Sequence, residues 1–429
     1  MARRLAAVVS VVVLFGVCSP AWGQDAKPSL EFVAPGADQT LAGSVEVRVK
    51  AKPPNVVPSH MFVTLGGPPF ARMARVGETD EWAGQLNTAL YPNGQSPLIV
   101  LAAMPGAKRV QQTLTVRVEN PLKCYFGDIH SHTYNSDGML LPADAHAYAR
   151  DVAKLDFFVL TDHLEAVDEL EWADMREQAW KANEDGVFVA FPGLEWTKGA
   201  GHANLLDPPT RLWPADVAGM YQAVRTAGII GMFNHPGDGS KVFDALAYSE
   251  IGDQAMQLME VRQDTEQAAF IRALNAGWHI APAGTDDTHS NNWGNAGRWT
   301  GIVAPGLSRR NVWDALKARH CYSTLDRNCR LFFRVNGALM GEVIAQPSPN
   351  AQVLIDITDP DEGDAIAKIE LYQDGVVTRA DEPTNGPTRV RASYTFEPEP
   401  GGHYYFVKVT QADGQKLWSA PVWLTVPAR

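Results

Sequence analysis

The middle of this 429-residue chain alternates short apolar segments with amphipathic ones, and each apolar segment is soon followed by a histidine or an acid. The pattern predicts strands at 155–160, 187–191, 229–233 and 280–283. It predicts helices at 143–154 after Pro142, at 169–183, and at 215–227 before Gly228, which is well placed to end a helix. Such alternation is typical of an α/β fold with a mostly parallel sheet.

Polar residues follow the four predicted strands in turn: Asp162-His163, Glu195, His235, and Asp287-Thr-His289. The carboxyl ends of the strands in a β/α barrel share one face, so we expect these side chains to converge on one pocket. Imidazoles and carboxylates suit zinc, manganese or iron. Several such ligands in one pocket predict a metal site that activates water for hydrolysis.

A further pair of histidines precedes the first of these strands. His130 and His132 lie two residues apart, so on an extended segment both rings point the same way and can bind one ion. Either histidine alone is weak evidence, because most histidines are ordinary core or surface residues. The joint pattern carries the metal hypothesis.

In order and spacing, these residues resemble the PHP superfamily of polymerase-and-histidinol-phosphatase metallohydrolases. The matching segments are His130-Ser-His132-Thr-Tyr-Asn-Ser-Asp137, Thr161-Asp162-His163, Gly193-Leu-Glu195, His202 in Gly-His-Ala-Asn, His235 in Asn-His-Pro-Gly, and Asp287-Thr-His289. The resemblance implies a distorted (β/α)7 barrel over residues 121–329. It also implies two or three divalent transition-metal ions (zinc, manganese or iron).

Carried over residue by residue, the resemblance implies three metal positions. They comprise His130, His132, Glu195 and Asp287; Glu195, His202 and His235; and Asp137, His163 and His289. Glu195 would bridge two ions, metal-activated hydroxide would attack the ester, and Asp162 would serve catalysis by orienting His163. The DxH spacing selects Asp287 over Asp286, which is left as either a supporting residue or a solvated turn acid.

The segment after the last motif narrows the resemblance. Arg298-Trp-Thr-Gly, Arg319-His-Cys-Tyr-Ser-Thr and Phe333-Arg-Val-Asn-Gly337 resemble the exported CehA/McbA-type branch, over about residues 121 to 372. That branch includes aryl carbamate hydrolases, and its substrates are diverse. Arg298 is a candidate substrate-binding residue, since a guanidinium can clamp a phosphate or carboxylate with two donors.

Short alternating segments flank the α/β region, as at 44–50, 114–118 and 351–357. They predict an immunoglobulin-like antiparallel β-sandwich at 29–120 and a second β-sandwich at 330–429. Cys321 and Cys329 form a disulfide or remain two thiols, because a separation of eight residues does not fix their geometry.

Residues 1–23 have a basic start, an apolar run and small residues near the end, which predicts a secretory signal peptide and a periplasmic location. The run is short for a bilayer, so no membrane anchor is expected, although Cys18 leaves lipidation as an alternative. The net charge of −12 argues against nucleic acid and anionic membranes as partners. The oligomeric state is not predicted.

The sequence therefore favours a metal-dependent phosphoesterase acting on a small-molecule ester. The alternatives are a carbamate or carboxylic ester hydrolase with the same metals, and a non-catalytic binding module. Cationic side chains such as Arg298 and Lys198 facing the pocket would favour phosphate, whereas Trp196, Trp293 or Trp299 lining it would favour a neutral substrate.

Overall fold

A computed structural model describes residues 27–54, 56–105 and 107–428, and the chain divides into two compact units. The expected signal peptide and Cys18 lie outside the described residues. The first unit comprises the chain up to Thr88 together with Gly94–Glu119. The second comprises Ala89–Asn93 and the chain from Asn120 onward. The regions expected as a barrel and as a C-terminal sandwich thus belong to one unit.

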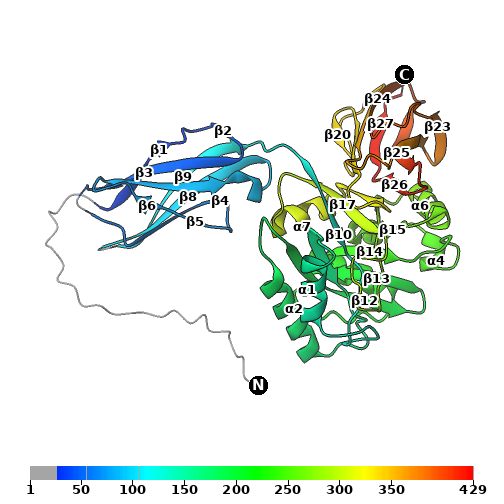
Figure 1. The fold of residues 1–429 in the computed structure, drawn as a ribbon, viewed down its shortest axis with the longest axis horizontal. Coiled ribbons are helices and arrows are strands. Elements are labelled where there is room, and N and C mark those ends of the chain that lie inside the picture. Colours follow the sequence, from blue (N-terminus) through cyan, green and yellow to red (C-terminus); the bar gives the residue numbers. More distant parts are fainter. Residues whose placement is uncertain (1–26, 55, 106, 429) are drawn as a thin grey trace. The chain divides into compact units, whose positions relative to one another are not determined.

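The first unit consists of two sheets (Figure 1). One has the order β1 (Ser29–Ala34), β3 (Ser44–Lys52), β7 (Glu81–Asn87), β6 (Ala74–Arg75); the other β2 (Thr40–Leu41), β9 (Ala107–Val118), β8 (Gly94–Met104), β4 (His60–Leu65), β5 (Ala71–Arg72). The ladders are antiparallel except for the short parallel pairing of β2 with β9. Val47, Val49 and Ala51 alternate along β3 and are at most 1% exposed, as expected for a strand with one buried face.

The second unit is built on a long curved sheet. Its first part has the order β16 (Ala281–Ala283), β15 (Met256–Glu260), β14 (Ile230–Asn234), β13 (Gly201–Leu206), β12 (Val189–Lys198), β11 (Phe157–Leu160), β10 (Lys123–Asp128), β17 (Trp299–Ala304), β18 (Cys321–Thr324). The ladders among β10, β11 and β12 and among β14, β15 and β16 are parallel. β13 is antiparallel to both neighbours, and β17 is antiparallel to β10. The sheet is therefore mixed rather than mostly parallel, because the β12–β13 hairpin returns the chain within the sheet.

The helices are α1 (Pro142–Asp151), α2 (Glu169–Ala182), α3 (Val217–Ala227), α4 (Phe243–Leu246), α5 (Glu250–Ala255), α6 (Asp264–Ala276) and α7 (Arg309–Lys317). The three predicted helices are confirmed as α1, α2 and α3. Asp168 caps α2 by accepting from two backbone amides, and Gly228 ends α3 with φ of 70°. Strands β11, β12, β14 and β16 match the four predicted strands, whereas β13 and β15 were not predicted.

The long sheet is buried on both sides and bends back toward its own start. Along β11, Phe157 and Val159 belong to one hydrophobic core, and Phe158 and Leu160 to another. The Thr300 hydroxyl donates to the Gly284 carbonyl at 2.8 Å, so the chain just after β16 approaches β17. This approach runs through a side chain and not through a strand ladder, and the (β/α)7 barrel stays a prediction.

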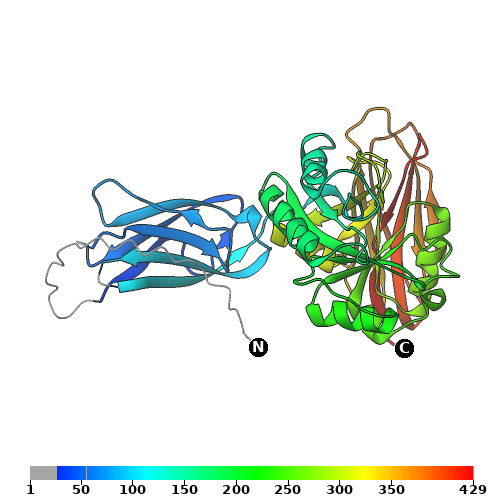
Figure 2. The same ribbon diagram turned by 90° about the horizontal axis from the view of Figure 1, so that it is seen from below.

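The C-terminal strands form two facing antiparallel sheets (Figure 2). Through pairing of β18 with β26 (Lys416–Ser419), the long sheet continues into β25 (Gly401–Gln411), β22 (Ile366–Gln373) and β23 (Val376–Asp381), with β27 (Val422–Val426) beside β25. The second sheet has the order β20 (Ala338–Leu339), β19 (Arg330–Val335), β21 (Ala351–Thr358), β24 (Arg389–Phe396). Phe333, Ile355, Leu371 and Val407 share one core between them.

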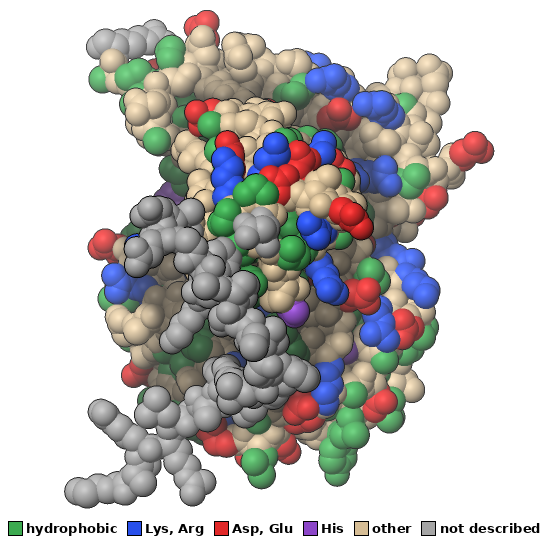
Figure 3. All heavy atoms as spheres, turned by 90° about the vertical axis from the view of Figure 1, so that its left-hand side faces the viewer, with side chains coloured by type: hydrophobic (Ala, Val, Ile, Leu, Met, Phe, Trp, Pro, Cys, Tyr) green, Lys and Arg blue, Asp and Glu red, His purple; other side chains and the backbone are tan. Residues whose placement is uncertain are grey.

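Acidic and basic side chains are interspersed on the face drawn in Figure 3. Among the described residues, no helix combines the length and the apolarity that crossing a membrane requires. The expected absence of nucleic-acid and membrane partners stays a prediction.

His146 in α1 gives the first testable prediction, on stability. It is 1% exposed, and within the described residues neither ring nitrogen has a hydrogen-bond partner. Burial lowers the pKa of His146 to about 3, so the unfolded chain binds the proton more readily below about pH 6.5. The folded protein should lose stability as the pH falls from about 6.5 toward 3, and His146→Leu should remove the part of this loss that protonation of His146 causes. Denaturant unfolding at pH 7.5 and pH 5.5 measures the difference, about 1 kcal/mol; equal pH dependence in both proteins would contradict it.

Candidate metal centre

Six histidines and three acids come together where the strands of the second unit end. Three groups of side chains place their ligand atoms within 4.8 Å of one another: His132, Asp137, His163 and His289; His130, His132 and Glu195; Glu195, His202 and His235. These are eight of the nine residues expected to bind metal. The ninth, Asp287, has Oδ1 3.3 Å from Nε2 of both His130 and His132.

The fold brings these side chains together because each lies in one of several neighbouring strands or in the loop that follows one. His130 and His132 follow β10, and His163 follows β11. Glu195 lies in β12 and His202 in the antiparallel β13, which pair so that Thr197 opposes His202. His235 follows β14, and Asp287 and His289 follow β16.

Glu195 is at the centre of the arrangement and only 1% exposed. Its Oε1 lies 3.3, 3.2 and 3.4 Å from ring nitrogens of His130, His202 and His235. Its Oε2 lies 3.4 and 2.9 Å from ring nitrogens of His132 and His163. Burial opposes ionisation, but the attraction of the surrounding imidazoles, that of His130 foremost, holds the pKa of Glu195 well below its usual range. The two oxygens of one carboxylate thus face two different sets of imidazoles.

The donor set fits a metal better than it fits a hydrogen-bond network. Within the described residues, the buried Nδ1 atoms of His163 and His202 have no hydrogen-bond partner, although each lies within 3.2 Å of a Glu195 oxygen. The Nε2 atoms of His130 and His132 also face each other at 3.2 Å. Buried polar atoms normally find partners, so ring nitrogens left beside a carboxylate without a hydrogen bond suit ligands of a shared cation.

Glu260 supports the centre and was not expected from the sequence. It ends β15, is fully buried, and its Oε1 lies 2.6 Å from Nδ1 of His130. It also accepts from the backbone amide of His235. Burial opposes its ionisation, but Arg262 and His130 lower the pKa of Glu260, so it is a carboxylate that can fix the His130 proton on Nδ1 and leave Nε2 for a metal.

The signal for Glu260 was present in the sequence. Met256-Gln-Leu-Met-Glu260 is a short apolar segment ending in an acid, the pattern that marked the other site residues. Its five residues are all buried in the structure. The helix and strand periods cannot be told apart over so short a segment.

Asp162 has a different partner from the one expected. It accepts from the Thr133 amide and hydroxyl at 2.7 Å each, and from the Ser136 hydroxyl at 2.6 Å. The two ring nitrogens of His163 face Glu195 and Asp137 instead. The structure therefore differs from the prediction that Asp162 orients His163: Asp162 accepts instead from the loop that carries Asp137. The side chain of Asp137 is 58% exposed.

The Asp162 contacts lead to a prediction. Asp162→Ala would leave the two buried donors of Thr133 and the half-buried Ser136 hydroxyl without this acceptor, which should lower the free energy of unfolding by about 1–3 kcal/mol. Because the loop would loosen, we expect metal near Asp137 to be lost before metal near Glu195. Metal content after stepwise chelation measures this. Asp216→Ala, which removes the helix cap of α3, serves as the control; the same metal loss in both variants would contradict the role of Asp162.

The structure separates the two adjacent aspartates. Asp287 faces His130 and His132, whereas Asp286 Oδ2 accepts from the Ala296 amide at 2.9 Å. Burial raises the pKa of Asp286 to about 6. Asp286 therefore supports the loop after the last motif.

Two of the residues near the centre have unusual backbone. Asp287 has φ of 52° and His235 has φ of 26°. Positive φ is uncommon outside glycine and costs energy that the surrounding structure must compensate. Its occurrence at two converging side chains is typical of a functional site.

The residues expected to contact substrate differ in their exposure and in their partners. Arg298 is exposed, and in the described part of the chain it forms no ion pair. Lys198 Nζ lies 3.8 Å from Glu165 and 5.3 Å from the ring centre of Trp213. Trp196 and Trp293 are at most 1% exposed, so they belong to the core and do not line an open pocket.

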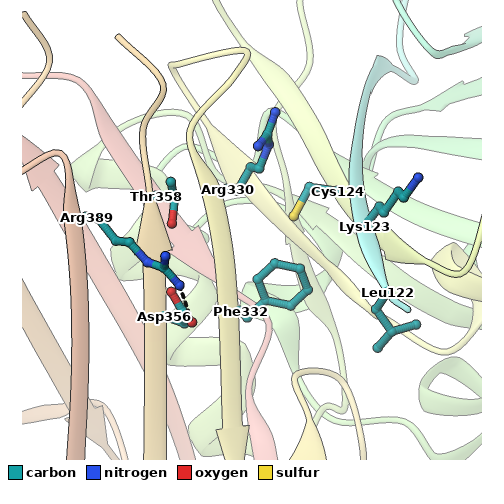
Figure 4. Close-up of a pocket in the computed structure, with 8 residues that line it drawn as sticks. All are labelled: Leu122, Lys123, Cys124, Arg330, Phe332, Asp356, Thr358 and Arg389. Atoms are coloured by element: carbon teal, nitrogen blue, oxygen red, sulfur yellow. Dashed lines mark ion pairs between the residues drawn. The ribbon is translucent and has the colours of Figure 1, made fainter. Parts of the chain in front are cut away.

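Other features lie apart from the centre. Cys124, Cys321 and Cys329 are free thiols, so the possible Cys321–Cys329 disulfide is not formed. The pocket in Figure 4 is lined by Lys123, Arg330, Asp356 and Arg389, among others, and by none of the expected site residues.

Comparison with known proteins names no function. No protein-family model matches this sequence. An uncharacterized protein of Chlamydia pneumoniae is 30% identical over 137 residues, and an uncharacterized protein of Chlamydia muridarum is 26% identical over the same length. Each match covers 29% of this chain and 22% of the relative, so the chain spans about a fifth of the length of these relatives.

Among solved structures, an endo-β-1,4-mannanase from Thermotoga petrophila aligns at 17% identity with a TM-score of 0.21, covering 23% of this chain and 21% of the mannanase. The fibronectin(III)-like modules of Clostridium thermocellum CbhA align at 7% identity with a TM-score of 0.17, covering 93% of this chain and 94% of theirs. These likenesses are too low to carry an argument.

Proposed function

We propose that this protein is a metal-dependent hydrolase of ester bonds, with phosphate esters as its first substrate class. The observation that carries the proposal is the convergence of six imidazoles and the carboxylates of Asp137 and Asp287 around the buried Glu195, with two buried ring nitrogens left unpartnered in the described chain. Divalent transition-metal ions held there would act as Lewis acids and would generate a nucleophile from water near neutral pH.

The chain's own residues prepare the site for that chemistry. The two oxygens of Glu195 face separate groups of imidazoles, which suits a carboxylate that bridges two ions. Glu260 holds the ring of His130 in one orientation, and Trp293 Nε1 donates to the carbonyl of His132 at 2.9 Å. Such supporting contacts fix the ligands before an ion binds.

Arg298 favours a phosphate substrate. Its side chain is exposed and without an ion pair among the described residues, and it follows the loop whose Ala296 amide binds Asp286. A free guanidinium can pair with the non-bridging oxygens of a phosphoryl group. We further propose that this activity takes place in the periplasm, because residues 1–23 are expected to be a secretory signal peptide.

A second candidate, hydrolysis of a carbamate or carboxylic ester by the same centre, is favoured by one observation. Tyr134, Met139, Leu140 and Leu141 are 48–74% exposed in the loop that also carries Asp137. Exposed apolar side chains grouped in one loop are typical of a surface that binds an apolar partner or ligand. An aromatic ester without charge would fit them.

Turnover of matched chromogenic esters tests the proposal. The metal-loaded protein is assayed with a phosphate monoester, a phosphodiester, a carbamate and a carboxylic ester that release the same phenol. We expect phosphoester turnover, with the KM raised about tenfold by Arg298→Ala and unchanged by Arg310→Ala. Turnover of the neutral esters alone would favour the second candidate, and no turnover of any ester would contradict both.

A further inference from the structure

A second cluster of acids, separate from the nine residues expected to bind metal, lies in the loop after β18 and the turn between β21 and β22. Asp326 follows β18, and Asp359, Asp361 and Asp364 lie in the turn between β21 and β22. The ligand atoms of Asp359, Asp361 and Asp364 are within 4.8 Å of one another, and Asp359 belongs to a second such group with Asp326 and Cys329. Asp326 is 6% exposed and Asp359 3%.

The protein meets the charge of this cluster with hydrogen-bond donors and not with ion pairs. Asp326 Oδ1 accepts from the amides of Asn328 and Cys329, and Asp359 Oδ1 accepts from the amide of Asp361. Among the described residues, none of these four aspartates forms an ion pair with a lysine or arginine. Burial and the neighbouring Asp326 raise the pKa of Asp359 to about 7. Buried like charges this close are costly unless a cation or protons neutralise them.

Amide side chains around the cluster supply an independent observation. Gln411 is 1% exposed, and its Nε2 donates to Asp326 Oδ2 at 2.8 Å and to Asp359 Oδ2 at 2.5 Å. Asn328 Nδ2 donates to Asp361 Oδ2 at 2.8 Å. Yet the amide oxygens of Gln411, Asn328 and Gln415 are buried and without a hydrogen-bond partner in the described chain. Buried amide oxygens normally find a partner, so three unpartnered ones, on residues that contact the acidic cluster or line its cavity, are available to coordinate a cation.

The donor chemistry identifies the kind of ion. Carboxylate and amide oxygens are the ligands of hard cations, and calcium takes about six to eight of them. The thiol of Cys329 is a poor competitor, because burial raises its pKa and only the thiolate binds metals well.

We propose that this cluster is a calcium site, built from Asp359, Asp361 and Asp364 with Asp326 and the amide oxygens beside it. The site would tie three parts of the second unit together: the loop after β18, the turn between β21 and β22, and the end of β25. Asn295, from the loop after His289, and Trp299, at the start of β17, line the same cavity as Asp326, Asp361 and Asp364. Calcium would therefore brace the loop beside the metal centre against the C-terminal strands.

Calorimetric titration of calcium into the metal-loaded protein tests the proposal. After calcium is removed and the transition metals are restored, we expect one calcium ion per chain, with a dissociation constant of about 10⁻⁴ M or tighter, and a higher melting temperature with calcium. Asp361→Asn with Asp364→Asn should weaken binding at least about tenfold, since two charged ligands are lost. Glu397→Gln with Glu399→Gln changes the same charge at exposed positions and should bind like the wild type.

Terbium luminescence locates the site. Terbium should bind in place of calcium and be excited by Trp299, and added calcium should quench the emission. Trp299→Phe should reduce the emission while calcium binding stays unchanged. Absence of calcium binding in the wild type, or equal affinity in the Asp361/Asp364 double variant, would overturn the proposal.

Discussion

Glu195→Ala should abolish hydrolysis and release metal from the protein. Glu195 belongs to two of the three ligand groups, as His132 does, and its oxygens lie 2.9–3.4 Å from five imidazoles. Removing it leaves those rings without the carboxylate between them. We expect kcat/KM to fall about 10³-fold or more, because metal activation is worth several kcal/mol.

Asp156→Ala is the matched control for this variant. Asp156 also lies beside β11, but at the opposite end from the centre, where its carboxylate accepts from the Phe126 amide at 2.7 Å. Its loss should affect stability without changing metal content. Glu195→Ala protein that keeps the metal content and activity of the wild type would contradict the bridging role.

Glu260→Gln should weaken the centre without removing any ligand. The substitution keeps the size of the side chain but removes the charge that faces Nδ1 of His130 at 2.6 Å. Losing such a supporting carboxylate typically costs about 10–100-fold in metal affinity or activity. We expect that loss in kcat/KM and in the affinity measured by competition with a chelator.

Glu266→Gln separates this effect from a general loss of charge. Glu266 is also buried and pairs with Arg262 at 2.8 Å, the arginine that lies 3.4 Å from Glu260. It contacts none of the nine residues expected to bind metal. A similar loss in both variants would assign the effect to Arg262 and not to the orientation of His130.

The local elements of the α/β region could be predicted from the sequence, because their signals are local. Pro142 at the start of α1, Asp168 before α2 and Gly228 after α3 act within one turn of the chain. The β12–β13 hairpin could not be predicted in the same way. Only Gly199 and Ala200 separate β13 from β12, and the antiparallel pairing of β13 with β14 joins residues distant in the sequence, such as His202 and Asn234.

The candidate site was predictable as a set of residue types, but its supporting contacts were not. Motif spacing predicted that His130, Glu195 and Asp287 belong to one site. In the structure, Nε2 of His130 lies 3.3 Å from a carboxylate oxygen of each of the two acids. The partner of Asp162 could not be read from its position beside His163. In the fold, the loop after His132 turns back onto Asp162 and supplies three donors.

The most direct test of the central claim is the transition-metal content of the purified protein, measured by mass spectrometry after reconstitution with zinc, manganese or iron. The metal-centre account predicts two or three ions per chain in the wild type and in Asp156→Ala, and a clear loss in Glu195→Ala. A wild-type protein that holds no transition metal after reconstitution, or a Glu195→Ala variant that holds as much as the wild type, would contradict it.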